Sequence, residues 1–254
     1  MRIKLPEAVR WIIGELQGHG YEAYAVGGCV RDSILCKEPK DWDITTSARP
    51  EQVKEIFERT IDTGIRHGTV MVLQNHVGYE VTTYRIDGEY EDARHPKEVV
   101  YTTDVRRDLM RRDFTINAMA YNERSGLVDE FGGVSDLKRG VIRCVGNASE
   151  RFAEDALRMF RAVRFAAQLD FEIENETAEA IRCLAENLRK ISAERIQMEL
   201  TKLLMSPHPQ KLRLLYELGL SAVVLPEFDV MMETRQNNPH HCDTVGGHTI
   251  RALM

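Results

Sequence analysis

Hydrophobic and polar positions follow two different patterns along the chain. Up to about residue 145, helical spacing alternates with short β-rich runs, such as residues 21–26, 69–74 and 79–84. The pattern predicts an α+β domain followed by an all-α region, with a boundary near residues 146–147. Beyond that boundary, helical spacing recurs over residues 149–169, 174–185, 193–205 and 209–218.

A glycine pair and two aspartates interrupt this pattern in the first domain. Gly27-Gly28 follows a predicted strand and opens a predicted helix that carries Arg31 one turn in. Asp41 and Asp43 lie two residues apart in the next predicted strand, which continues to residue 46. Because side chains at i and i+2 of a strand share a face, we expect both carboxylates to leave the sheet together.

This combination of groups indicates phosphoryl or nucleotidyl transfer. Asp41 and Asp43 are predicted to hold one or two Mg²⁺ ions, because hard oxygen ligands suit that cation. The backbone at Gly28 and the guanidinium of Arg31 are predicted to hold a triphosphate. An Arg31–Asp32 ion pair on the helix face is the alternative for that arginine, and it ranks lower.

A third carboxylate is a candidate on a neighbouring strand. Glu80 belongs to the second β-rich run of a predicted hairpin over residues 69–84. Adjacent strands lie about 4.8 Å apart, so a carboxylate there is within reach of a metal bound by the aspartates. Glu80 is therefore either a third catalytic carboxylate or an ordinary exposed strand glutamate, and the sequence favours neither.

Two arginine-rich segments carry further candidate chemistry. In the first, four arginines lie within residues 106–112, beside an apolar run over residues 114–120. Asp113 and Asn117 need hydrogen-bond partners if they are buried there. We expect Arg112 to reach phosphate or sugar, with a purely structural arginine cluster as the weaker alternative.

The second arginine-rich segment is the predicted helix over residues 149–169. Asp155 and Arg158 share a face of such a helix, Arg161 lies at the edge of that face, and Arg164 points elsewhere. A carboxylate beside a guanidinium presents an acceptor next to a donor, which matches cytosine and adenine and mismatches uracil and guanine. The structural alternative is an i,i+3 salt bridge, worth about 0.2–0.5 kcal/mol.

Composition narrows the class of protein further. With 254 residues and 43% hydrophobic residues, the chain can bury a sizeable core. A net charge of −6 disfavours an indiscriminate nucleic-acid binder, and no apolar run reaches the roughly 20 residues of a membrane span. The five cysteines are scattered without Cys-x-x-Cys spacing, which predicts reduced thiols and a cytoplasmic location.

Two further segments differ from their surroundings. Residues 86–105 form a long polar stretch without a clear pattern, which we expect to be functional or mobile. Residues 250–254 begin a helical pattern without a termination signal. We therefore expect the 254 residues to be part of a longer protein.

Five motifs follow one another along the chain. They are Gly27-Gly28-x-Val30-Arg31-Asp32, Asp41-x-Asp43, Arg111-Arg112-Asp113-Phe114-Thr115-Ile116-Asn117-Ala118, Glu154-Asp155-x-x-Arg158 and Ala193-Glu194-Arg195-Ile196. In this order they resemble the class II tRNA nucleotidyltransferases, or CCA-adding enzymes, and their bacterial poly(A) polymerase relatives. The resemblance implies a polymerase-β-like head over residues 1–146, a helical neck over 147–206 and the start of a helical body over 207–254.

The resemblance also implies an activity and roles for single residues. It implies addition of CMP and AMP to the 3′ end of tRNA, from CTP and ATP, with release of pyrophosphate. It assigns Mg²⁺ to Asp41 and Asp43, and the triphosphate to Gly28 and Arg31. Further nucleotide contacts are implied for Arg112, Asp155, Arg158, Arg161 and Arg164.

Three alternatives to full CCA addition stay open. They are a poly(A) polymerase, an enzyme that adds only CC or only the terminal A, and a catalytically silent RNA-binding module. Intact Asp41 and Asp43 argue against the silent module. The length of residues 86–105 favours the full enzyme, because the family's CC-adding members are shortened in this loop.

The last histidines resemble the opening of an HD-type phosphohydrolase domain. They are His240, His241 and His248, with Cys242 and Asp243 between them. The His-Asp pair that names that domain does not occur before Met254. We therefore predict no activity from this segment, and an exposed histidine turn describes it nearly as well.

Overall fold

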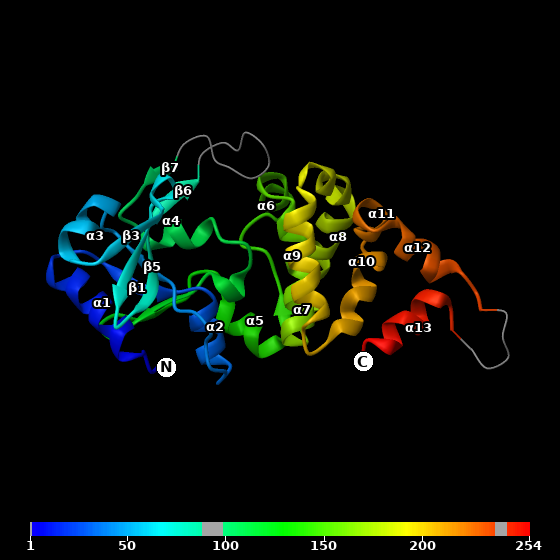
Figure 1. Cartoon of the computed structure of the whole chain (residues 1–254), viewed down its shortest axis with the longest axis horizontal. Coiled ribbons are helices and arrows are strands. Elements are labelled where there is room, and N and C mark those ends of the chain that lie inside the picture. Colours follow the sequence, from blue (N-terminus) through cyan, green and yellow to red (C-terminus); the bar gives the residue numbers. More distant parts are fainter. Residues whose placement is uncertain (1, 88–98, 237–242) are drawn as a thin grey trace. The chain divides into compact units, whose positions relative to one another are not determined.

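The computed structural model describes residues 2–87, 99–236 and 243–254 (Figure 1). Contacts group the chain into two compact units, one ending at Lys138 and the other beginning at Arg139. Each unit buries apolar side chains of its own. The division into head, neck and body at residues 146 and 206 stays a prediction.

A seven-stranded sheet forms the centre of the first unit, in the order β3-β4-β5-β2-β1-β8-β9. β2 and β5 are parallel, and the other neighbouring strands are antiparallel. The predicted hairpin is confirmed, with Asn75 and His76 at positive φ between β4 and β5. The strands are β1 (Ala23–Val26), β2 (Ile44–Thr46), β3 (Thr60–Gly64), β4 (Thr69–Gln74), β5 (Val77–Thr83), β8 (Ala120–Asn122) and β9 (Gly126–Val128).

Helix α1 (Glu7–Gly18) contributes an apolar stripe to this core. Val9, Ile12, Ile13 and Leu16 recur at helical spacing and are buried, and the helix packs against β1 (Figure 1). Helix α2 (Gly28–Ile34) starts two residues after β1 ends, so the glycine pair forms the turn between strand and helix. The remaining helical segments are α3 (Pro50–Ile56), η1 (Ile65–His67), α4 (Val105–Met110), η2 (Thr115–Asn117) and α5 (Gly133–Arg139).

A separate two-stranded ribbon consists of β6 (Arg85–Asp87) and β7 (Val99–Tyr101). Residues 86–105, the polar stretch without a clear sequence pattern, carry regular structure at both ends, in β6, β7 and the first residue of α4. Strand pairing explains this, because Ile86 and Val100 face each other in the ribbon. Residues 88–98, in the middle of the stretch, lie outside the described residues.

Helices dominate the second unit, as predicted. α7 (Leu157–Leu169) buries Phe160 and Val163 and packs against α9 (Ala193–Leu204). No strand was expected after residue 145, yet β11 (Glu172–Ile173) pairs in parallel with β10 (Val141–Ile142). The other segments are α6 (Ala148–Glu154), α8 (Asn175–Leu184), η3 (Ala185–Lys190), η4 (Pro209–Leu212), α10 (Arg213–Glu217), α11 (Ser221–Val224), α12 (Pro226–Glu233) and α13 (Val245–Ala252).

The predicted continuous helix over residues 149–169 is wrong in its middle. α6 ends at Glu154 and α7 begins at Leu157, and Asp155 between them has an extended backbone with φ −142° and ψ 103°. The Asp155 carboxylate accepts the backbone N–H of Leu157 at 3.0 Å. Such a local bond lets aspartate compete with helical hydrogen bonding. Asp155 therefore lies at a helix junction and not on a helix face.

Two further sequence predictions concern membrane spans and the HD-like segment. No helix within the described ranges is long and apolar enough to cross a membrane. Of the HD-like residues, His248 lies on α13, whereas residues 240–242 fall outside the described ranges.

Candidate active site

Asp41 and Asp43 precede β2, which begins at Ile44. The prediction that both belong to the strand is therefore wrong, because the ladder between β1 and β2 begins with the pair Ala25 and Ile44. The backbone of Asp43 is still fixed, since its carbonyl accepts the N–H of Val26 at 3.0 Å. Asp43 thus extends from the central sheet. Asp41 and Asp43 both keep solvent-exposed surface, although protein atoms partly shield the Asp43 carboxyl.

Glu80 lies next to these aspartates because of the parallel pairing of β2 and β5. Ile44 is opposite Val81, so the residues just before them, Asp43 and Glu80, are neighbours across the two strands. Burial raises the pKa of Glu80, and the charges of Asp43 and Asp41 raise it further. The structure therefore places Glu80 beside the carboxylates of Asp41 and Asp43, although a catalytic role for Glu80 stays a prediction.

Asp43 experiences both attraction and repulsion. Burial raises the pKa of its carboxyl, Arg112 lowers it in part, and Asp41 raises it. Carboxylates that repel one another favour a cation between them. Within the described ranges, no three His, Cys, Asp or Glu side chains enclose a common metal position. Mg²⁺ is typically held by one or two carboxylates plus substrate phosphates, so the donor set fits a cation shared with a phosphate ligand.

The turn at Gly27-Gly28 lies between two guanidinium groups. Gly27 has φ +82°, and a Cβ at this position would lie 2.9 Å from Nη1 of Arg112. A Cβ at Gly28, the first residue of α2, would lie 3.6 Å from Nη2 of Arg31. Glycine is therefore needed at residue 27 for the backbone and for the close approach of an arginine.

Arg31 is held in place by two side chains. Its Nε donates to Asp32 at 2.8 Å and its Nη1 donates to the Asn117 side-chain oxygen at 2.6 Å. Asn117 in turn donates to Asp113 at 3.2 Å, which also accepts the N–H of Phe114. The Arg31–Asp32 ion pair, ranked lower from the sequence, is thus present. It fixes the guanidinium beside the start of α2, and the phosphate role stays a prediction.

Arg112, the second arginine beside the glycine turn, is held by Asp108. Its Nη2 lies 3.5 Å from Oδ2 of Asp108, a carboxylate with no exposed surface. The Nε of Arg112 is buried and has no hydrogen-bond partner among the residues that the structure describes. A buried N–H without a partner fits an anionic ligand at this position. Asp108 was not among the residues predicted from the sequence, although an acid three residues before one arginine and four before the next was a usable signal.

In the second unit, the predicted pair Asp155 and Arg158 does not share a helix face. The two oxygens of Asp155 accept from Nη2 and Nη1 of Arg195 at 2.8 and 3.4 Å. Nη1 of Arg158 donates to Glu154 at 2.5 Å and to the carbonyl of Arg151 at 3.1 Å. The helix junction at Asp155 is the reason, because it turns this carboxylate toward α9.

The guanidinium groups of Arg164 and Arg161 both lie over the ring of Phe165. The guanidinium carbon of Arg164 lies 3.8 Å from the ring centroid, and that of Arg161 lies 5.3 Å from it. Arg164 is buried and forms an ion pair with Glu199 of α9. The structure thus gives Arg164 an internal packing partner, whereas its nucleotide contact stays a prediction. Sequence reasoning missed Glu199, which lies on the same helix as Arg195 and four residues after it.

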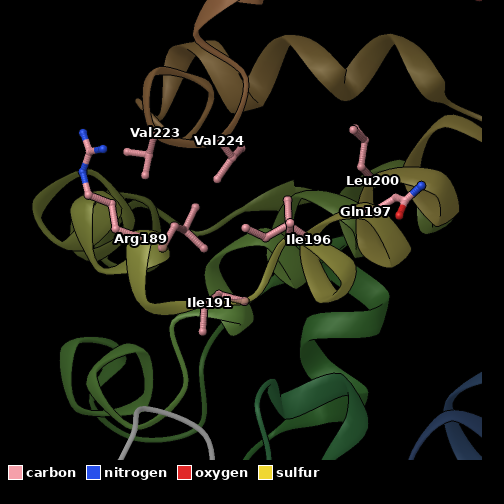
Figure 2. A pocket seen from close by; sticks show the side chains of 9 residues that line it. Arg189, Ile191, Ile196, Gln197, Leu200, Val223 and Val224 are labelled. Carbon is pink, nitrogen blue, oxygen red and sulfur yellow. The ribbon is translucent and has the colours of Figure 1, made fainter.

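A separate groove of about 500 Å³ lies between η3, α9 and α11 of the second unit. Figure 2 shows Val223 and Val224 facing Ile196 across it. The predicted site residues do not line this groove, and its wall is mainly aliphatic. We therefore assign it no part in nucleotide chemistry.

Two family profiles match the chain. One, described as "Poly A polymerase head domain", matches residues 23–143. The other, "Probable RNA and SrmB- binding site of polymerase A", matches residues 170–232.

Curated relatives are CCA-adding enzymes of bacteria. The enzyme of Lactiplantibacillus plantarum is 53% identical over 203 residues, which is 80% of this chain and 50% of the relative. That of Anoxybacillus flavithermus is 49% identical over 223 residues, which is 87% of this chain and 56% of the relative. The chain thus spans about half the length of the curated relatives that it matches.

Solved structures of the same enzymes share the fold. The CCA-adding enzyme of Bacillus stearothermophilus in complex with CTP has a TM-score of 0.83 and 45% identity, covering 89% of this chain and 56% of that one. The Thermotoga maritima enzyme complexed with tRNA has a TM-score of 0.70 and 25% identity, covering 94% and 58%. These matches confirm the polymerase-β-like head with a mixed sheet and a helical remainder. The chain belongs to the family of class II tRNA nucleotidyltransferases and bacterial poly(A) polymerases.

Proposed function

We propose that this chain adds CMP and AMP to the 3′ end of tRNA without a nucleic-acid template, using CTP and ATP and releasing pyrophosphate. The proposal is carried by two adjoining sets of charges. The guanidiniums of Arg31 and Arg112 lie at the glycine turn after β1, and the carboxylates of Asp41, Asp43 and Glu80 are neighbours of one another. The names of the relatives, all CCA-adding enzymes, support this choice of reaction within the family.

In the proposed mechanism, Asp41 and Asp43 hold Mg²⁺, and Glu80 adds a third negative charge nearby. A Mg²⁺ ion held by these residues would polarise the α-phosphate and lower the pKa of the attacking tRNA hydroxyl. Arg112 and the backbone at Gly28 bind triphosphate oxygens, with Arg31 oriented beside them by Asp32 and Asn117. The same positive groups stabilise the charge that develops on the departing pyrophosphate.

Base selection is assigned to Asp155 and Arg158. Their roles rest on donor and acceptor order, because a carboxylate and a guanidinium match the amino group and ring nitrogen of cytosine and adenine. The ion pair with Arg195 supports this role for Asp155, since it fixes the direction of the carboxylate. Arg161 and Arg164 are proposed to assist, Arg164 through its packing on Phe165.

Poly(A) addition is the second candidate, because the profile that matches the first unit is named for poly(A) polymerase. An enzyme that adds only CC or only the terminal A is a variant of the main proposal. A tRNA-processing reaction favours a cytoplasmic location, where cysteines such as Cys29, Cys36 and Cys183 stay reduced.

One assay separates these candidates. The protein is incubated with tRNA lacking CCA, tRNA ending in C and tRNA ending in CC, each with one labelled nucleoside triphosphate and Mg²⁺. We expect CMP on the first two substrates, AMP on the third, and no UMP or GMP. Repeated AMP addition would indicate a poly(A) polymerase. Binding of tRNA without any transfer would contradict the proposal.

A further inference from the structure

The carboxylate of Asp108 contacts four residues of the first unit. Its Oδ1 accepts from Nε and Nη2 of Arg111 at 2.9 and 2.8 Å, and from the backbone N–H of Arg85 at 3.3 Å. Its Oδ2 accepts from the hydroxyl of Thr45 at 3.2 Å and lies 3.5 Å from Nη2 of Arg112. A fully buried carboxylate with this many donors is held in a single orientation.

Two of these partners link Asp108 to the catalytic carboxylates. Thr45 is on β2, two residues after Asp43. Nη1 of Arg112 lies beside Gly27, and the preceding residue, Val26, donates its backbone N–H to the carbonyl of Asp43 at 3.0 Å. Asp108 therefore bonds both to the strand that follows Asp43 and to the arginine beside it.

Without Asp108, the Arg112 guanidinium would lose its buried anion. The nearby carboxylate of Asp43 would then attract it, because an unpaired buried charge is costly. An arginine paired with Asp43 would compete with Mg²⁺ for that carboxylate and would no longer offer its donors to phosphate. The negative charge of Asp108 thus affects ligand binding as well as folding, because it keeps Arg112 from pairing with Asp43.

We propose that Asp108 is a positioning residue for nucleotide binding. It holds Arg112 through Nη2, so that Nη1 stays beside the glycine turn and Asp43 stays available to Mg²⁺. This inference rests on the proposed function, since it assumes that the carboxylates and Arg112 bind a nucleoside triphosphate with its cation.

The first test is Asp108→Asn, which keeps the shape of the side chain and removes its charge. We expect CTP to bind roughly tenfold to hundredfold more weakly in the presence of Mg²⁺, because the guanidinium is displaced. The Mg²⁺ concentration for half-maximal CTP binding should rise in the same variant. Asp136→Asn is the matched control, because Asp136 is an equally buried carboxylate that accepts from Thr115 at 2.6 Å. This control should lower the melting temperature without changing CTP affinity.

A double-mutant cycle tests whether Asp108 acts through Arg112. If it does, adding Asp108→Asn to Arg112→Ala should change CTP affinity by less than about twofold. Effects that multiply would overturn the inference, because they would show that Asp108 acts independently of Arg112. CTP affinity of Asp108→Asn within about twofold of wild type would overturn it as well.

Variants of Thr45 provide a second test of the inference, and they leave the buried charge of Asp108 intact. Thr45→Val removes the hydroxyl that donates to Asp108, whereas Thr45→Ser keeps it. We expect weaker CTP binding in the valine variant and recovery in the serine variant. If Asp108→Asn fails to fold, the comparison of Thr45→Val with Thr45→Ser tests the inference in its place. Equal CTP affinity in these two variants would overturn the inference. A wild-type chain that binds CTP but transfers no nucleotide overturns only the proposed function, since all these readouts are binding constants.

Discussion

The Asp155 carboxylate and the Arg195 guanidinium form a two-pronged ion pair across 40 residues of sequence, with Nη2 2.8 Å and Nη1 3.4 Å from its oxygens. Both side chains are largely shielded from solvent. The pair fixes the direction of the carboxylate that we assign to base selection, although the two residues belong to different sequence motifs.

Removing Arg195 should therefore relax base selection. We expect Arg195→Ala to raise incorporation of UMP and GMP relative to CMP and AMP, because Asp155 loses its fixed orientation. Asp155→Ala should act in the same direction. Arg182→Ala is the control, because Arg182 pairs with Glu179 on the exposed surface of α8. Equal loss with all four nucleotides in the Arg195 and Asp155 variants would show that the pair is only structural.

Alanine at position 41 or 43 should abolish nucleotide transfer. Each substitution removes a Mg²⁺ ligand from an exposed segment, so the melting temperature should stay close to that of wild type. Labelled CMP transfer to tRNA lacking CCA is the measurement. Transfer at near wild-type rate in either variant would exclude the two-carboxylate mechanism.

Glu80→Gln should stabilise the protein when divalent cations are removed. The substitution removes one of three carboxylates that repel one another, so the melting temperature in EDTA should rise. Nucleotide transfer with Mg²⁺ should fall in the same variant. Asp62→Asn is the control, because Asp62 is an exposed carboxylate of β3 that pairs with Lys54. An unchanged melting temperature of Glu80→Gln in EDTA would show that Glu80 does not repel Asp41 and Asp43.

Gly27→Ala should weaken CTP binding as well as stability. A Cβ there combines a positive φ with a contact of 2.9 Å to Arg112, and the guanidinium is the part that can move. Gly126→Ala is the matched control, because Gly126 has φ +78° and nothing within 4 Å of the added atom. Both variants should lose about 1 kcal/mol of unfolding free energy through backbone strain. Only Gly27→Ala should lose CTP affinity, and equal affinity in the two variants would contradict the contact.

The acid stability of the protein should depend on Asp108. Burial alone would raise the pKa of this carboxyl, but Arg111, Arg112 and the Arg85 N–H bring it below its usual value. A lowered pKa in the folded state stabilises above the unfolded pKa, near 4, and this contribution is lost as the pH falls through the folded value. Asp108→Asn should cost roughly 3 kcal/mol at pH 7.

The difference between wild type and Asp108→Asn should be constant above about pH 5 and shrink below about pH 4. Denaturant unfolding of both proteins between these values measures it. A difference that does not change with pH would show that Asp108 is not ionised in the fold.

The order of elements and the local chemistry of the turns could be predicted from the sequence. The Gly27-Gly28 turn, the β4–β5 hairpin and the helical second half follow from periodicity and glycine placement, which act over a few residues. The candidate residues at the glycine turn could be named for the same reason. Their types and spacing indicate phosphate and metal chemistry before any contact is known.

Which residues meet was decided by the tertiary structure. Glu80 could be placed beside Asp43 only through the parallel pairing of β2 and β5, which no local pattern encodes. The helix junction at Asp155 differs from the periodic prediction because the carboxylate bonds to Leu157 and to Arg195, the latter on a distant helix. Asp108 was missed for the same physical reason. A buried charge is stable only with its partners assembled, and Thr45 is 63 residues away in the chain.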